Sequence, residues 1–243
     1  MLTSRLILAV GLALPAAPLG GSPWDQPPEK WDQVDAYRIL QNSPWSPAEA
    51  KLDAKSTLRH TERQTGLVTD ATANTNDTNL VPGIAISRGK SQPGVPVLWW
   101  SSKTIRLARQ RLRQLRDPTK TGPLRADDLP DYVLVMEGSD AVRIFRDAKE
   151  DLHDSVFLEL PASTTLDLES VSFFEGTVDE EARVEFHFPR QIDGRTTLEP
   201  ETERILFHCK GSAKTPRAGR NNMVSLRVEF KPRAMRVRGV PDL

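Results

Sequence analysis

The sequence predicts an α+β fold, because apolar residues are spaced differently in different parts of its 243 residues. They recur at helical spacing in residues 30–45 and 103–116, whereas they alternate with polar residues from residue 183 onward. A polar stretch, residues 46–94, separates the first helix from the remainder. We therefore expect an N-terminal amphipathic helix, a disordered linker, a mixed region of strands and helices, and an antiparallel C-terminal sheet.

The composition narrows the class of protein. A hydrophobic content of 38% and a charged content of 27% are typical of a soluble protein, and 19 prolines indicate many loops. The formal net charge is zero, so the overall charge does not favour a nucleic-acid partner. Cys209 is the only cysteine, which excludes an internal disulfide and a four-cysteine metal site.

Residues 1–22 have the composition of an export signal. Arg5 supplies a positive charge, the apolar run Leu6–Leu19 follows, and small residues near its end offer cleavage sites. The run is shorter than the roughly 20 residues that span a bilayer. We therefore expect a periplasmic or extracellular protein with no stable transmembrane span after the signal is removed.

The stretch Lys30–Trp45 predicts one short amphipathic helix. Pro44 disfavours helical geometry at the residue before it, so the helix should end near Asn42. Two interpretations of Trp31 and Trp45 are open. Both side chains anchor the helix on the core, or they form an exposed aromatic docking patch, since tryptophan is enriched at binding hot spots.

The linker has almost nothing to bury and is therefore expected to remain disordered. A short apolar piece within it, Val81–Ile86, either forms a strand or lies loose, and Asn76 begins a common glycosylation motif. The expected organisation is a signal peptide at 1–22, a helical segment at 23–45, a linker at 46–94 and an α+β domain at 95–243.

A strand at residues 95–100 should precede a helix at residues 103–116, which a serine caps. The core face of this helix contains four apolar residues: Ile105, Ala108, Leu112 and Leu115. A neighbouring arc contains four arginines: Arg106, Arg109, Arg113 and Arg116. This arc is either a solvated face paired with acids such as Asp127, Asp128 and Asp131, or a ridge that binds anions.

The following segments predict a strand at 132–136, a helix at 140–151 and a strand at 156–160. Residues 184–188, 205–209 and 224–230 then alternate with a period of two, as half-buried antiparallel strands do, and a short last strand is expected at 235–237. Sequence alternation also places Cys209 and the adjacent histidine on opposite faces, which predicts a buried cysteine without a Cys–His pair.

Charge is segregated along the chain. Residues 147–185 contain twelve acids and two bases, whereas residues 210–238 contain nine bases and one acid. The simplest interpretation is that the two stretches are neighbours in one sheet and neutralise each other across strands. The alternative is a basic surface that recognises an acidic polymer of the envelope.

No catalytic motif is present. Glu185 and His187 lie two apart on the polar face of a strand, where they would form an acid–base or metal pair, although such a pair is usually ordinary surface. Phosphate-binding loops, nucleophile elbows and zinc-protease helices are missing from the sequence. We assign no catalytic, cofactor-binding or metal-binding residue.

Several segments together resemble an uncharacterised family of exported bacterial proteins. The resemblance is carried by ILQNSPW at Ile39–Trp45, LWWSS at Leu98–Ser102 leading into the helix with Arg106, FPR at Phe188–Arg190, and the closing strands at 228–230 and 235–239. It implies export and one shared fold, and it supplies no activity.

These observations favour a non-catalytic envelope or extracellular protein that binds another protein or an acidic polymer. The candidate interaction residues are Trp31, Trp45, Trp99, Trp100, Arg106, Arg109, Arg113 and Arg116. The competing hypothesis is an exported hydrolase that uses Glu185 and His187. A third is a purely structural envelope component.

Overall fold

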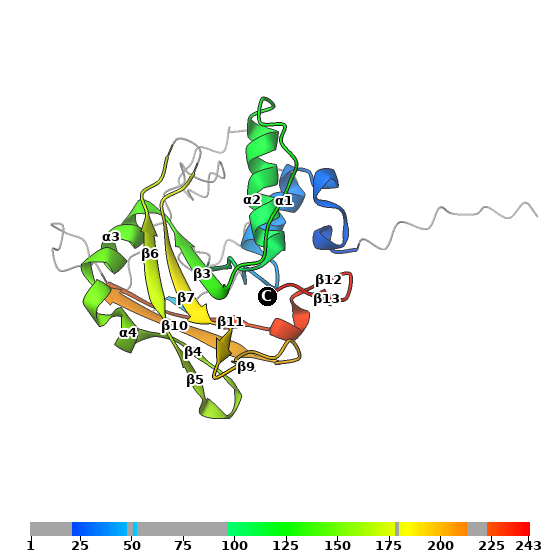
Figure 1. Ribbon diagram of the computed structural model, residues 1–243. Coiled ribbons are helices and arrows are strands. Elements are labelled where there is room, and N and C mark those ends of the chain that lie inside the picture. Colours follow the sequence, from blue (N-terminus) through cyan, green and yellow to red (C-terminus); the bar gives the residue numbers. More distant parts are fainter. Residues whose placement is uncertain (1–20, 48–50, 53–96, 178–179, 213–222) are drawn as a thin grey trace, which may run out of the picture.

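The structure is a computed structural model that describes residues 21–47, 51–52, 97–177, 180–212 and 223–243 (Figure 1). Within these ranges it has the predicted α+β architecture, with helices and antiparallel sheets. The predicted signal peptide lies outside the described residues except for its last two positions. Most of the predicted linker, including Val81–Ile86 and Asn76, also lies outside them.

The N-terminal segment begins with two 3-10 turns, η1 (Pro23–Asp25) and η2 (Pro28–Lys30), and continues into helix α1 (Gln33–Gln41). The helix therefore begins three residues later than the predicted Lys30. The reason is a capping box, in which the Asp32 carboxylate accepts a 2.8 Å hydrogen bond from the backbone N–H of Asp35. The predicted end is confirmed, because Asn42 is the C-cap.

Two larger sheets form the body of the protein. One has the order β2-β3-β7-β6 and consists of β2 (Val97–Trp99), β3 (Asp131–Glu137), β7 (Arg183–Pro189) and β6 (Ser170–Phe174). The other has the order β1-β11-β10-β4-β5 and consists of β1 (Lys51–Leu52), β11 (Met223–Phe230), β10 (Ile205–Ser212), β4 (Val156–Glu159) and β5 (Thr165–Asp167). All the pairings are antiparallel.

Two short hairpins lie beside these sheets. They are β8 (Gln191–Ile192) with β9 (Arg195–Thr196), and β12 (Arg236–Val237) with β13 (Val240–Pro241). The remaining helical elements are α2 (Lys103–Arg116), α3 (Ser139–Asp147), η3 (Lys149–Asp151), α4 (Leu152–Ser155), η4 (Pro161–Ser163) and η5 (Pro232–Ala234). The predicted bounds of α2 are confirmed, and Ser102 is its cap.

Strand β1 shows that the linker was predicted to begin too early. Lys51 pairs with Arg227 and Leu52 with Leu226, so this short piece extends the edge of the second sheet. Ser46 is also buried, and its hydroxyl donates a 2.6 Å hydrogen bond to the Leu40 carbonyl. Such pairings join residues far apart in the sequence, which is why composition alone classified this piece as linker.

The core lies between the two sheets, where their aromatic faces meet. Phe207 of β10 has its ring centroid 5.5 Å from Phe186 and 6.3 Å from Phe188, both on β7. Phe145 of α3 closes one end of this layer, with its ring 5.2 Å from Phe186. Gly211 of β10 makes room for that ring, because a Cβ there would lie 2.6 Å from the Phe145 ring. Each such buried side chain contributes about 1.5–3 kcal/mol.

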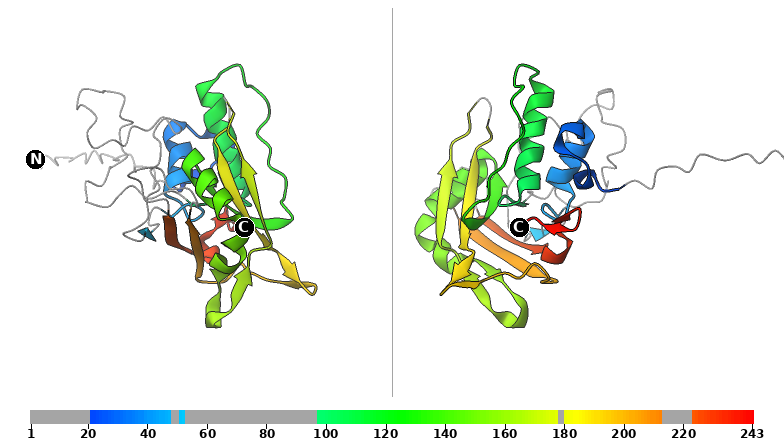
Figure 2. Two further views of the ribbon diagram at one scale, coloured as in Figure 1. Left: turned by 90° about the vertical axis from the view of Figure 1, so that its left-hand side faces the viewer. Right: turned by 45° about the vertical axis from the view of Figure 1, so that its right-hand side comes forward.

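The N-terminal segment folds back onto the same core. Trp99 of β2 lies 5.2 Å from the Phe230 ring, and its backbone N–H donates a 2.8 Å hydrogen bond to the Trp45 carbonyl. Helix α1 packs beside α2, and the N-terminal segment also lies beside the β12–β13 hairpin (Figures 1 and 2). Helix α2 is therefore enclosed by segments from both ends of the chain.

Candidate functional site

Three of the candidate tryptophans are core residues. Trp31, Trp45 and Trp99 are each at most 2% exposed. The indole N–H of Trp31 donates to the Pro23 carbonyl at 2.7 Å, and that of Trp45 donates to the Asp242 carbonyl at 2.6 Å. These bonds satisfy the indole N–H groups of Trp31 and Trp45 inside the protein. Of the two interpretations of Trp31 and Trp45, the core anchor therefore holds and the exposed docking patch does not. Trp99, the third candidate, is also buried and offers no exposed surface.

Trp100 is half-buried and contacts a cation. The Arg183 guanidinium lies 5.3 Å from the Trp100 ring centroid and 4.2 Å from that of Phe174. The same arginine donates a 2.7 Å hydrogen bond to Glu185. Trp100 thus contacts Arg183 of β7, and its side chain is only partly exposed.

The arginines of the predicted arc on α2 have partners within the chain. Arg109 and Arg113 pair with acids other than those predicted, whereas Arg106 and Arg116 donate to a backbone carbonyl and a hydroxyl. Arg106 contacts the Asp127 backbone carbonyl at 2.5 Å, Arg113 lies 3.0 Å from Glu180, and Arg116 donates to the Tyr37 hydroxyl at 2.7 Å. Arg109 is buried and contacts two acids, Glu137 and Glu181. Neutralisation by an acidic side chain is thus seen for Arg109 and Arg113.

The Arg109–Glu137–Glu181 cluster is the most strongly perturbed group of charges. Arg109 is hydrogen-bonded to Glu137 and lies 3.5 Å from Glu181. Burial, and after it the nearby Glu137 carboxylate, raise the pKa of Glu181 to about 7, although Arg109 opposes both. Burial alone would lower the pKa of Arg109, but the two acids hold it above its ordinary value. The two carboxylates thus share one cation.

Among the described residues, an acid of the stretch 147–185 meets a base of the stretch 210–238 across the second sheet at Glu159. Glu159 of β4 lies 3.6 Å from Arg227 of β11 and 2.7 Å from His208 of β10. The acids that follow β6 are in the other layer instead and pair with arginines there, as Glu175 does with Arg146. The expectation that the acidic and basic stretches are neighbours in one sheet therefore holds only in part. Strands β4 and β5 of the acidic stretch share the sheet of β10 and β11, whereas β6 and the beginning of β7 belong to the other sheet.

Glu185 and His187 lie together but are covered rather than exposed. His187 Nε2 is 3.6 Å from Glu185 Oε2, and His187 Nδ1 is 3.3 Å from Asp131. The contacts with Glu185 and Asp131 raise the pKa of His187, although burial opposes them. Burial would raise the pKa of Glu185, but His187 and Arg183 hold it below its ordinary value. The arrangement is an ion-pair chain across β3 and β7.

Two expectations about Cys209 are tested by the second sheet: that it is buried, and that it does not pair with His208. Cys209 is buried and free, and burial raises the pKa of its thiol well above the ordinary value. His208 lies on the opposite face, stacked on Phe157 with a centroid distance of 4.6 Å. Within the described ranges, no group of three or more His, Cys, Asp or Glu side chains is arranged to hold a metal ion.

The family-like motifs have structural roles here. In ILQNSPW, the Ser43 hydroxyl donates to the Ile39 carbonyl at 2.6 Å, and Ser43 bridges to Ser46 through the backbone. These bonds turn the chain after α1 and direct Trp45 inward. In FPR, Phe188 is a core residue and the Arg190 guanidinium lies 4.4 Å from the Tyr132 ring centroid.

The described residues form a large apolar pocket that the sequence does not indicate. It has a volume of about 790 Å³ and lies where the N-terminal segment, the beginning of α2, the β12–β13 hairpin and the segment 190–200 meet. Figures 1 and 2 show the first three of these elements side by side. No local pattern marks this place, because the walls come from segments that are distant in the sequence.

The pocket has an apolar floor and a polar mouth. Four residues at most 3% exposed form the floor: Trp31, Thr104, Tyr132 and Leu198. Half-buried apolar residues continue the walls: Trp24, Pro27, Pro28, Leu107, Pro200, Val237 and Leu243. The mouth contains exposed side chains: Gln26, Asp128, Thr196, Arg238, Val240 and Pro241.

The charges around the pocket hold its walls together. The Asp242 carboxylate accepts hydrogen bonds from the backbone N–H groups of Lys103 and Thr104 at 2.8 and 3.0 Å, and from the Ser102 hydroxyl at 2.7 Å. It thereby caps α2 and complements the helix dipole. The Arg238 backbone N–H and guanidinium both contact Asp25, which joins the N-terminal segment to the last hairpin.

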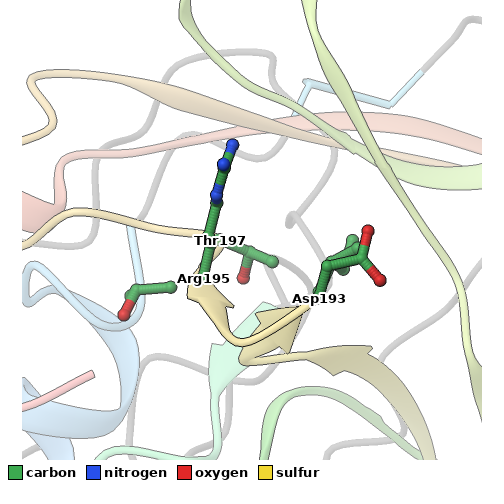
Figure 3. A pocket seen from close by; sticks show the side chains of 5 residues that line it. Asp193, Arg195 and Thr197 are labelled. Atoms are coloured by element: carbon green, nitrogen blue, oxygen red, sulfur yellow. The ribbon is translucent and has the colours of Figure 1, made fainter.

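A second depression, of about 450 Å³, lies at the β8–β9 hairpin. It is lined by Ile192, Asp193, Arg195, Thr196 and Thr197. Figure 3 shows that the side chains of Asp193 and Arg195 do not point toward one another. All five residues come from one exposed hairpin, so this depression has only one wall and makes a poorer binding site than the apolar pocket.

Comparison of the chain with protein-family models, with curated proteins and with solved structures gave no match. Among the described residues, no helix is both long enough and apolar enough to cross a membrane.

Proposed function

We propose that the protein is a non-catalytic binding protein of the periplasm or the extracellular space, and that its ligand occupies the apolar pocket. The observation that carries the proposal is a volume of about 790 Å³ above an apolar floor. Ligand sites in proteins are typically roughly 300–1,000 Å³ in volume, mostly apolar, with a few polar groups that orient the ligand. Export is proposed from Arg5, from Leu6–Leu19, and from the resemblance to exported bacterial proteins.

This proposal moves the contact surface away from the residues that the sequence suggested. Buried tryptophans offer a partner no surface, and the α2 arginines already have partners within the chain. The hydrolase alternative has less support, because both ring nitrogens of His187 face carboxylates of the protein itself. A general base needs a nitrogen that is free to take the substrate proton.

The test is binding of an uncharged fluorescent probe, N-phenyl-1-naphthylamine, to the whole chain. Val240 lies at the pocket mouth and is 66% exposed, so Val240→Asp adds a charge there without disturbing the core. Ile192→Asp is the matched control, because Ile192 is 50% exposed and does not line the apolar pocket. We expect saturable binding at one site and at least a tenfold loss of affinity in Val240→Asp alone.

Two results would contradict the proposal. One is the lack of any saturable binding by the unaltered protein. The other is equal loss in the two variants, which would mean that the probe adheres to exposed apolar surface rather than to the pocket. Thermal unfolding of each variant serves as the folding control. Trp45→Ala is unsuitable as a binding variant because Trp45 is completely buried, so its removal would disturb the core.

A further inference from the structure

We infer that the ligand of the apolar pocket is an uncharged molecule with a hydrocarbon chain, such as the acyl chain of a lipid or a free long-chain alcohol. This inference rests on the proposed function, since it names the class of ligand for the same pocket. It depends on two properties of the pocket, namely that the surrounding charged side chains already have partners in the protein and that four prolines line the walls.

The acidic groups around the pocket are engaged by the protein. Asp128 forms an ion pair with Lys103, with an Nζ–Oδ1 distance of 2.9 Å. Asp242 is held by the first turn of α2 through three hydrogen bonds. A cationic ligand would therefore have to displace Lys103 or uncap the helix. In either case the ligand would only replace a contact that the carboxylate already makes, so the net gain in binding free energy would be small.

The two arginines around the pocket are engaged as well. Arg190 donates to the carbonyls of Leu129 and Leu243, at 3.1 and 2.5 Å, while its guanidinium lies over Tyr132. Arg238 donates to the Asp25 carbonyl at 3.0 Å. These bonds engage each guanidinium with groups of the protein itself. Charge complementarity therefore favours a ligand whose buried part has no charge.

Four prolines in the walls reduce the number of backbone donors that an extended peptide could use. Pro27, Pro28, Pro200 and Pro241 line the pocket, and proline has no backbone N–H. A bound peptide segment keeps its polar backbone groups and requires partners for them when it is buried. A hydrocarbon chain has no such groups, so this wall disfavours a peptide and suits a chain of methylene groups. Binding then depends on the apolar area that the chain removes from water.

The experiment is displacement of N-phenyl-1-naphthylamine from the whole protein by straight-chain alcohols from octanol to hexadecanol. Burial of one CH₂ group contributes about 0.8 kcal/mol, so affinity should rise about fourfold per added CH₂ until the cavity is full. The carboxylic acid of each chain length is measured in parallel at pH 8, where it is ionised. We expect the acids to bind no more tightly than the alcohols.

The outcomes separate the two proposals. Acids that bind more than tenfold tighter than alcohols would overturn the uncharged class, and an affinity independent of chain length would overturn the hydrocarbon chain. In both cases saturable probe binding that Val240→Asp weakens would leave the binding function intact. Failure of the probe itself to bind would instead remove the binding function.

A second experiment distinguishes whether the bound hydrocarbon chain comes from a membrane lipid or from a free molecule. Phosphatidylcholine vesicles with a labelled acyl chain are incubated with the protein and then removed by centrifugation. Label that remains with the soluble protein, and that Val240→Asp reduces while Ile192→Asp does not, identifies lipid as a source. Displacement of the probe by alcohols without such transfer identifies free chains.

Discussion

The buried Arg109–Glu137–Glu181 cluster predicts that the protein loses stability as the pH rises from about 4.5 to about 7. Glu181 lies beside Glu137 of β3, with Arg109 and Arg116 of α2 as the opposing cations. Its neighbour Glu180 points instead to Arg113 and Arg183. One buried guanidinium thus faces two carboxylates, and the folded protein holds a proton that the unfolded chain would release.

The direction and the size of this loss of stability follow from the pKa of Glu181. The pKa of Glu181 rises from an ordinary 4.5 to about 7 in the folded protein, so the stability is highest below pH 4.5 and falls until the pH passes about 7. At about 1.36 kcal/mol per pH unit, the loss is roughly 3 kcal/mol at most. This corresponds to a fall in Tm on the order of 5–10 °C for a chain of this size.

His187 and Glu185 also change the stability with pH, but over pH ranges that can be distinguished from that of Glu181. The pKa of His187 is raised, so the stabilisation from its ion pairs is complete below pH 6.5 and is lost as the pH passes its raised value, in the same direction as for Glu181. The pKa of Glu185 is lowered, so its stabilisation is complete above pH 4.5 and is lost at more acidic pH. The decline between pH 4.5 and 6.5 therefore belongs to the cluster of Glu181.

The assay is urea unfolding at intervals between pH 4.5 and 8, for the unaltered protein and for two variants. Glu181→Gln is neutral throughout and should flatten the decline, leaving the variant more stable than the unaltered protein at pH 8. Glu180→Gln is the matched control, because its carboxylate is half-exposed and its removal should change the stability by less than about 1 kcal/mol. A decline that persists unchanged in Glu181→Gln would refute the reasoning.

Two predictions concern packing and capping. Gly211→Ala should lower the free energy of unfolding by roughly 1–3 kcal/mol in urea, because the added Cβ meets the buried ring of Phe145; Gly122→Ala, with open space around it, should be neutral, and equal effects would contradict this reading. Asp242→Ala should cost about 1 kcal/mol by uncapping α2 and should also weaken probe binding, because the segment after the last hairpin loses its side-chain bonds to α2. An unchanged urea midpoint would show that the cap is dispensable.

Periodic patterns predicted the elements well. The helix at Lys103–Arg116 has the predicted bounds, because its apolar arc and its serine cap are both local features. The alternation in residues 184–188 and 224–230 likewise predicted β7 and β11, with Phe186 and Val228 completely buried. Leu115 is an exception, since it is 37% exposed although it shares the apolar arc of α2. It lies in the last turn of the helix, which the core does not cover.

The partners of charged residues were not predictable in the same way. The sequence offered nearby acids such as Asp131 to the arginines of α2, yet Arg109 meets Glu137 and Glu181 because β3 and the segment before β7 pass this face of the helix. Ion pairs depend on which elements are adjacent in space. That adjacency follows from the order of strands in each sheet, which no local pattern encodes.

By itself, the sequence determined most of the longer helices and strands, which faces of them are apolar, and that Trp31 and Trp45 had either a core or a surface role. Strands β5 and β6 and the β8–β9 hairpin were not predicted. The tertiary structure alone decided between those two roles and created the pocket. Trp31, Leu107, Leu198 and Val240 line one cavity although they come from four separate segments. Secondary structure is set by short-range spacing, whereas a cavity is set by the way the whole chain packs, so only the folded chain reveals it.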